Sequence, residues 1–199
     1  MNIKIEPRKP AYEAIIKKLD SVGADSQDAV KDAINDTAKY LKDELHAAVK
    51  GTYSVKSSQF KKADIIKKNA TKNQPTATIT VTGYTPSLYE SYKFYKNTKH
   101  KAVRAMIKKA GGKKDIQLSG GSHKAFVATM SNGHTGIFQR KPGTRMKKGS
   151  RSREKIKQIN AMSKSKAAEM VFREQLQEDT EERLNLMLHK HMYLALEGK

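Results

Sequence analysis

The 199-residue sequence contains no cysteine, so neither a disulfide bond nor a thiolate metal site can form. No apolar run approaches the ~20 residues that a membrane-spanning helix requires. The first ten residues, MNIKIEPRKP, lack the apolar core of a signal peptide. These absences predict a soluble protein made in a cytoplasm, with no membrane partner.

Acidic residues are scarce in the middle of the chain, where residues 51–160 contain 25 Lys/Arg and only 4 Asp/Glu. A two-metal nuclease needs several converging carboxylates, which this region does not supply. The sequence also has no Gly-Xaa-Ser-Xaa-Gly nucleophile elbow and no phosphate-binding loop. His189 and His191 are two positions apart, which places them on different faces of a helix. We therefore predict no enzyme activity, no cofactor and no metal site.

The chain has a net charge of +20, and the whole excess of basic over acidic residues lies in residues 51–160. A concentrated positive field attracts polyanions such as nucleic acids. The alternative is a charged, solvated face of a lysine-rich β region. Aromatic residues interleaved with lysines from Tyr84 to Lys96 leave two similar interpretations open, a base-stacking surface or the core of a small sheet.

Apolar residues recur every 3.6 positions over residues 26–50 and over 165–196, which predicts two long amphipathic helices. Gly51 is expected to end the first of them, and a shorter helix should begin near Pro10. Between the two predicted long helices, apolar residues recur at every second position instead. Thr76–Thr82 alternates threonine with apolar residues, as a half-buried strand does.

Segregation of helices from strands favours an α+β fold over a parallel α/β fold. We predict a twisted antiparallel sheet of hairpins over residues 60–160 that packs against the two long helices. The whole chain, 1–199, is expected to be one domain. A helical part (1–50) and a C-terminal helix (161–199) flank its basic, β-rich middle (51–160).

The clearest local pattern is a hairpin. Ala125–Met130 and Thr135–Gln139 are typical of strands, and Asn132-Gly133 between them is typical of a two-residue turn, in which Gly133 tolerates positive φ. His134 beside the turn is a candidate metal ligand or general base. Because no second ligand is nearby in the sequence, we expect a structural or interface role, in which a ring N–H donates a hydrogen bond to a carbonyl and holds the turn rigid.

A two-residue turn also predicts which side chains meet across the hairpin. Val127 should face Phe138, and Gly136 should face Thr129, where the missing side chain leaves room for a close neighbour. Since side chains alternate along a strand, Phe126 and Phe138 should then point to opposite faces.

Basic residues follow the hairpin over residues 140–157, where Pro142, Gly143 and Gly149 interrupt regular structure. With almost no apolar anchors, this segment is expected to be a long mobile loop that becomes ordered when a partner supplies anions. The candidate DNA- or partner-facing residues are Arg140, Lys141, Arg145, Lys147, Lys148, Arg151 and Arg153, and Lys155 and Lys157 continue the run.

The hairpin contains Ala125-Phe126-Val127-Ala128, followed by Gly133-His134-Thr135-Gly136-Ile137-Phe138-Gln139-Arg140. This order resembles phage tail proteins of the minor tail protein Z type, or tail completion proteins, which carry Ala-Phe-Val-Ala and then Gly-His-Xaa-Gly-(Val/Ile)-Phe-Xaa-Arg. Upstream, Ile116–Ser119 looks like the family's Ile-Pro-Leu-Ser, with Gln117 in place of the proline. Glu154–Met162 lacks the prolines of the family's Pro-Ile and Gly-Pro-Ser segments. The resemblance covers roughly a third of the chain, Lys101–Val171.

The resemblance implies a structural virion protein that completes the head-proximal end of a phage tail, without catalysis. Its motif residues here are Phe126, Gly133, His134, Gly136, Phe138 and Arg140. The implied partners are further copies in a ring of six, the tail tube or tail terminator, neck or head-completion proteins, and genomic DNA in the lumen. Such a protein would be assembled into the virion in the host cytoplasm. The alternative is a nucleic-acid-binding protein with a basic β-sheet surface.

Overall fold

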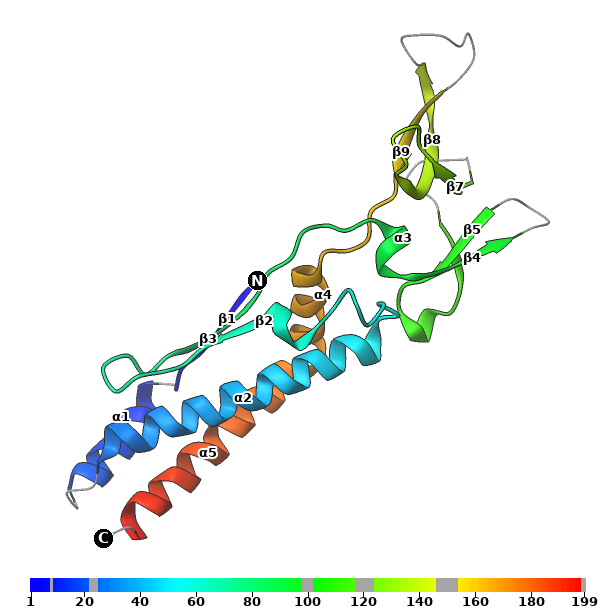
Figure 1. Ribbon diagram of the computed structural model, residues 1–199. Coiled ribbons are helices and arrows are strands. Elements are labelled where there is room, and N and C mark those ends of the chain that lie inside the picture. Colours follow the sequence, from blue (N-terminus) through cyan, green and yellow to red (C-terminus); the bar gives the residue numbers. More distant parts are fainter. Residues whose placement is uncertain (8, 22–24, 98–101, 117–123, 146–153, 198–199) are drawn as a thin grey trace. The chain divides into compact units, whose positions relative to one another are not determined.

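A computed structural model describes residues 1–7, 9–21, 25–97, 102–116, 124–145 and 154–197. Helices and antiparallel sheets are both present, which confirms the α+β class (Figure 1). Instead of one sheet, the described strands form three sheets of three strands each.

The chain divides into two compact units. The helical unit comprises Met1–Val49, Lys61–Gly83 and Ser165–Lys199, and the basic unit comprises Lys50–Phe60 and Tyr84–Lys164. The predicted boundary near residue 50 lies close to one of these divisions, but residues 61–83 belong with the helices. That both units form one domain stays a prediction.

In the helical unit, both predicted long helices are present. The helices are α1 (Lys9–Asp20), α2 (Ser26–Thr52), η1 (Lys62–Asp64), α4 (Lys164–Val171), the π-helical segment η3 (Phe172–Leu176) and α5 (Gln177–Glu197). Gly51 does not end α2, which continues to Thr52. A side chain at Gly51 would meet nothing within 4 Å, so the glycine here marks an open position near the helix end.

The helical unit holds one sheet, with the strand order β1 (Asn2–Ile5), β3 (Ala77–Val81), β2 (Ile65–Lys68). All neighbours are antiparallel, with Ile3 opposite Ile79 and Ile66 opposite Thr80. The alternation predicted for β3 is confirmed, because its alanine, isoleucine and valine are buried while its threonines are half-buried.

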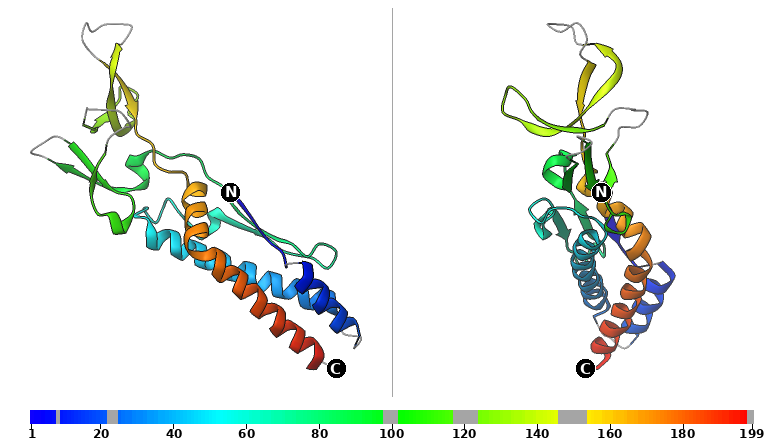
Figure 2. Two further views of the ribbon diagram at one scale, coloured as in Figure 1. Left: turned by 180° about the vertical axis from the view of Figure 1, so that it is seen from behind. Right: turned by 90° about the vertical axis from the view of Figure 1, so that its right-hand side faces the viewer.

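Helices α2 and α5 run side by side in the views of Figures 1 and 2. Two polar contacts join them: His191 Nε2 lies 3.0 Å from the Asp36 carboxylate, and the Arg183 guanidinium lies 5.1 Å from the centre of the Tyr40 ring. Near the C-terminal end of α5, Leu19 of α1 and Ala29 of α2 are buried and pack against Met192, Ala195 and Leu196. Most residues of the apolar stripes predicted from the sequence are buried on α2 and on the first half of α5, whereas Leu194 is exposed.

The basic unit contains two sheets and a short helix. Its elements are α3 (Leu88–Ser91), β4 (Lys93–Asn97), β5 (Ala102–Met106), η2 (Lys109–Gly111), β6 (Lys114–Asp115), β7 (Phe126–Thr129), β8 (Thr135–Arg145) and β9 (Glu154–Gln158). The sheets have the orders β4-β5-β6 and β7-β8-β9, both antiparallel. Backbone hydrogen bonds from Leu88 to Ile159 and from Ala161 to Pro86 tie the residues after β9 to the start of α3.

One side chain secures the loop after β2 to α2. Asn35 donates from Nδ2 to the Ala70 carbonyl at 3.2 Å, and its Oδ1 accepts from the Ala70 N–H at 2.8 Å. Ala70 is buried, so no solvent is at hand to replace either bond.

Replacing Asn35 with alanine should therefore lower the free energy of unfolding by about 1–3 kcal/mol, because both backbone groups of Ala70 would lose their partner. Asn73→Ala, on the exposed turn of the same loop, is the matched control and should change little. Urea denaturation of both variants measures the difference. Equal unfolding midpoints would show that the Asn35 bonds do not hold the loop.

Candidate functional site

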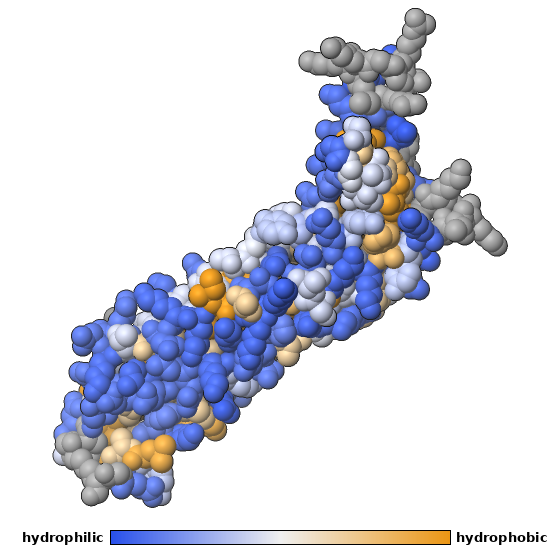
Figure 3. All heavy atoms as spheres, in the orientation of Figure 1, coloured by the Kyte–Doolittle hydropathy of each residue, from blue (hydrophilic) through white to orange (hydrophobic). Residues whose placement is uncertain are grey.

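The net positive charge belongs to one of the two units. The basic unit holds 22 Lys/Arg and 3 Asp/Glu, a net charge of +19, whereas the helical unit holds 18 and 17. Figure 3 shows one face of the molecule, on which hydrophilic residues cover most of the surface and hydrophobic residues only small areas. Charge is accordingly the property by which the basic unit can be distinguished by a partner.

The predicted hairpin is present as β7 and β8, but its register differs from the prediction by one residue. Phe126 lies opposite Phe138, and Val127 lies opposite Ile137. Because successive side chains alternate between faces, a shift of one residue moves a whole strand's side chains to the other face. Phe126 and Phe138 consequently share a face, with ring centroids 6.5 Å apart, and the prediction that they point to opposite faces is wrong.

The register follows from the turn, which has three residues instead of two. The Gly133 N–H donates to the Met130 carbonyl at 2.9 Å, and the Met130 N–H donates to the His134 carbonyl at 2.8 Å. Gly133 has a φ of 81°. This is the three-residue hairpin loop in which a turn is followed by a left-handed residue. Asn132 contributes through its Oδ1, which accepts from the His134 N–H at 3.1 Å.

Gly136 lies opposite Ala128, not opposite Thr129 as predicted. The close neighbour expected at this glycine is the ring of Phe138: a Cβ on Gly136 would be 3.1 Å from two of its carbon atoms. The amide nitrogen of Gln158 on β9 would be 3.4 Å away. Gly136 thus allows the buried Phe138 ring to lie over its own strand.

His134 packs edge-on against Phe138, with centroids 6.4 Å apart and planes at 89°. Its Nε2 is buried and has no hydrogen-bond partner within the described part of the chain, so the predicted ring-to-carbonyl bond is not made from this atom. No group of three or more His, Asp or Glu residues that could hold a metal ion occurs in residues 1–7, 9–21, 25–97, 102–116, 124–145 and 154–197.

Arg140 is exposed, and its guanidinium lies 5.8 Å from the centre of the Phe126 ring. Such a cation over an aromatic face is favourable by roughly 0.5–1 kcal/mol at an exposed site. The first and last residues of the motif, Phe126 and Arg140, are thereby in contact although fourteen positions separate them in the sequence.

The prediction of a mobile loop over residues 140–157 is wrong at both ends. β8 continues to Arg145, and β9 begins at Glu154, so that Arg140 lies opposite Ile156 and Arg145 opposite Glu154. A register shift separates these two pairs, and Gly143 within it has a φ of 72°. Lys141, Arg145, Lys155 and Lys157 are exposed on the two paired strands. Lys147, Lys148, Arg151 and Arg153 lie outside the described residues.

The aromatic residues that the sequence left between two interpretations divide between them. Tyr92 is buried, and burial raises the pKa of its hydroxyl to about 12, with a smaller contribution from Tyr53. Tyr95 is half-buried, and the Lys113 ammonium lies 3.9 Å from its ring centre. Lys56 lies 5.9 Å from the ring of Phe94. Some rings are therefore core residues, and others carry a lysine on the face that a base would need for stacking.

Two residues of this site were not predicted from the sequence. Gln139 is fully buried in the middle of β8, and Gln158 of β9 reaches the Gly136 backbone region. A polar residue within an apolar strand was the available signal for Gln139. Nothing local indicated Gln158, because its position depends on the pairing of β9 with β8.

No family model, curated protein or solved structure matches the chain. Among the helices that the structure describes, none is both long and apolar enough to cross a membrane. The hairpin β7–β8 and the charge of the basic unit are therefore the features of this chain that bear on its function.

The two glycines of the hairpin should respond differently to substitution. At Gly133 the added side chain meets open space but the φ of 81° strains it, so Gly133→Val should cost roughly 1–3 kcal/mol and Gly133→Asn much less. At Gly136 the obstacle is the Phe138 ring, so Gly136→Ala should cost about 1–3 kcal/mol. Thermal unfolding of the three variants tests this. If Gly133→Asn is as unstable as Gly133→Val, the left-handed turn is wrongly assigned.

Proposed function

We propose that this protein is a structural component of a tailed-phage or phage-derived particle, which completes the head-proximal end of the tail and helps to join it to the head. The observation that carries the proposal is the hairpin β7–β8. The motif residues that resemble tail completion proteins all fall on it and depend on one another. Gly133 forms the turn, Gly136 accommodates the Phe138 ring, and Arg140 lies over Phe126.

We further propose that the protein acts as a ring of copies, six in number if the ring follows a six-fold tail tube. A ring brings the basic units of neighbouring copies together, and like charges repel. Three sources can offset the repulsion: DNA in the lumen, an acidic partner, or the acidic helix faces of the next copy. The last is a head-to-tail contact, which closes into a ring when the rotation fits.

The acidic faces differ in how far they are already engaged. On α2, Asp28 contacts Lys31 and Lys72, and these two lysines hold the pKa of the Asp28 carboxyl at about 2. Asp43 forms an ion pair with Lys62. On α5, Glu178, Asp179 and Glu182 are exposed and form no ion pair with a residue of the described part of the chain. The face at 174–182 is accordingly the better candidate for the basic unit of a neighbour.

The proposed neighbours are the tail tube or tail terminator on one side and neck or head-completion proteins on the other. The role is mechanical: the protein bridges two assemblies in the virion and carries out no reaction. Electron microscopy of particles produced without this protein tests it. Complete heads and tails that fail to join would support the proposal, and normally joined, infectious particles would exclude it.

The exposed lysines of β8 and β9 should contribute to joining without contributing to folding. Replacing Lys141, Lys155 and Lys157 with serine should reduce the yield of joined particles, while the melting temperature changes little, as is usual at exposed positions. Lys17→Ser, Lys18→Ser and Lys39→Ser combined in the helical unit are the matched control for loss of charge. Joining that is equally reduced in both triple variants would mean that total charge, and not the β8–β9 surface, is what matters.

The second candidate is a nucleic-acid-binding protein, which the net charge of +19 on the basic unit favours. Lysines over Tyr95 and Phe94 argue against base stacking and for contact with phosphates. Affinity for free DNA that falls steeply with salt and depends on sequence or strandedness would favour this candidate. Weak free-DNA binding together with assembly onto tail tubes would favour the first.

A further inference from the structure

The sheet of the helical unit ends in an edge strand, β1, whose outward backbone groups can be identified. Met1 and Val81 exchange two backbone hydrogen bonds, at 3.2 and 3.0 Å. Hydrogen-bonded and non-hydrogen-bonded pairs alternate in an antiparallel ladder. Ile3 therefore bonds to Ile79, while the N–H and C=O of Lys4 point away from β3. Among the described strands none pairs with this side of β1, which thus presents a free edge, a ready template for a further strand.

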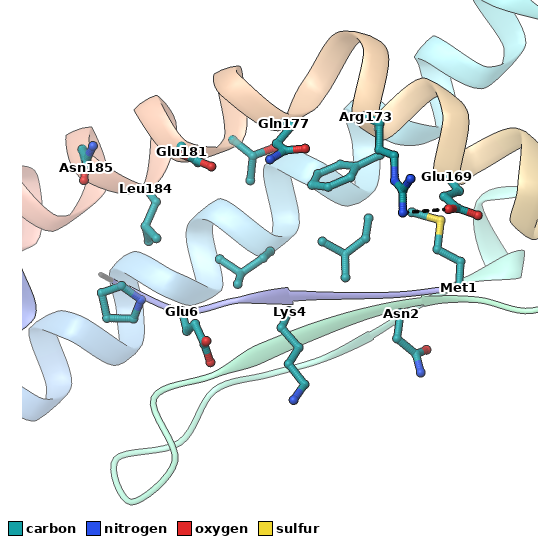
Figure 4. Close-up of a pocket in the computed structure, with 15 residues that line it drawn as sticks. Met1, Asn2, Lys4, Glu6, Glu169, Arg173, Gln177, Glu181, Leu184 and Asn185 are labelled. Carbon is teal, nitrogen blue, oxygen red and sulfur yellow. Dashed lines mark ion pairs between the residues drawn. The ribbon is translucent and has the colours of Figure 1, made fainter. Parts of the chain in front are cut away.

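A cavity of about 810 Å³ lies beside this edge, between β1 and the helical layer formed by η3 and α5. Phe172 and Leu184 line it from the helices. In Figure 4, Glu181 and Leu184 extend from α5 toward β1, while Lys4 points to the other side of the strand. The helical layer therefore extends past the last strand of the sheet, and one more strand would continue the sheet over it.

The same sheet has its second edge at β2. The alternation that points Lys4 outward from β1 makes Thr80 bond to Ile66, so the backbone groups of Lys67 point away from β3. Ile66 on the outer face of β2 is 54% exposed. An apolar side chain beside a free strand edge is a feature that assembly would bury.

We propose that the free edge of β1 in one copy binds the free edge of β2 in the next, so that the sheet continues from copy to copy. β1 and β2 each run antiparallel to β3. Two copies in the same orientation consequently bring β1 and β2 together as a parallel pair. The contact joins two different edges, so it is head-to-tail and can close into a ring. The strand contact itself does not depend on the proposed function; only the closure of the contacts into a ring rests on it.

Charge complementarity supports β2 as the occupant. Parallel strands run together from Asn2 toward Glu6, which places Lys67 and Lys68 at the end of the cavity that Glu6 and Glu181 line. Lys67 is on the inward face of the sheet, on the side of the helical layer, as its half-burial shows. The ammonium group of Lys67 would then approach the carboxylate of Glu181 on α5 of the neighbouring copy.

The outer face gains an apolar contact in the same arrangement. Ile66 would lie beside the alkyl stem of Lys4 of the neighbouring strand and lose much of its exposure. Parallel pairs are slightly less stable per residue than antiparallel ones. Association by so short a pair should accordingly be weak in solution and become strong only when many copies assemble on one template.

The absence of cysteine makes this contact testable by disulfide cross-linking. Lys4 and Lys68 both lie on the outer face, but β3 separates them, so within one copy they are about 10 Å apart. A disulfide needs Cα atoms within about 7 Å. Ile66 is still farther from Lys4 within one copy, because it lies opposite Thr80 and Lys4 lies opposite Thr78. Any bond in the double variant Lys4→Cys/Ile66→Cys, the two positions that lie side by side in the proposed contact, must therefore join two copies, and Lys4→Cys/Lys68→Cys covers a register displaced by two residues.

We expect oxidation of either double variant to produce a ladder of covalent multimers, both in concentrated protein and during particle assembly. Lys4→Cys/Lys17→Cys, with its second cysteine on α1, is the control. Adding Lys67→Pro removes the outward N–H of β2, whereas Lys67→Ser keeps it, so only the proline should reduce the ladder, by about tenfold.

Multimers no more abundant than in the Lys4→Cys/Lys17→Cys control, in concentrated protein and in particles alike, would overturn the proposal. So would equal ladders in the Lys67→Pro and Lys67→Ser backgrounds. Circular dichroism tests whether each variant is folded. If the Lys67→Pro variant is not folded, the ladder in the Lys67→Ser background, compared with the Lys4→Cys/Lys17→Cys control, decides. Failure of cross-linking alongside particles whose tails do not join without the protein would reject the strand contact and leave the proposed function standing.

Discussion

In the proposed ring, repulsion between the basic units of neighbouring copies is the constraint that every other contact must satisfy. The net charge is +19 on the basic unit and +1 on the helical unit, so the attraction for anions is concentrated on the basic unit. The basic unit can approach further copies only where acidic groups or nucleic acid reduce the repulsion. We therefore expect the proposed ring to form on a template and not by spontaneous association in solution.

In the proposed assembly, the two units would supply different surfaces. In the basic unit, Gly133 and Gly136 allow two short strands to carry Phe126, Phe138 and Arg140 in one compact hairpin. In the helical unit, the sheet leaves free edges at β1 and β2, and α5 carries exposed carboxylates. Strand edges give a direction to the contact, and the charges determine under which ionic conditions it forms.

The sequence predicted those parts of the fold that local periodicity determines. The stripe that runs along α2 and the alternation in β3 each repeat over enough residues to identify their element. Gly51 misled because a glycine near a helix end is a weak stop signal when the position is open. The division of the strands into three sheets depends on pairings between distant segments, which no local pattern contains.

The hairpin shows the same limit more sharply. Asn132-Gly133 fits a two-residue turn and a three-residue turn equally well, and the choice between them decides which face every side chain of β7 occupies. Packing decides it here, because the three-residue turn brings Phe126 and Phe138 onto one face with His134 beside them. The paired strands on either side of residues 146–153 were missed since charged and glycine-containing strands lack an apolar pattern.

The central proposal is that this chain is a ring component at the head-proximal end of a tail. Cryo-electron microscopy of assembled particles tests that claim most directly, through the position and symmetry of density into which the two units fit. The account predicts a closed ring at the junction between tail and head, six-fold if it follows the tail tube, with neighbouring copies in head-to-tail contact. A stable dimer with a two-fold interface, found both in solution and unchanged in the particle, would contradict it.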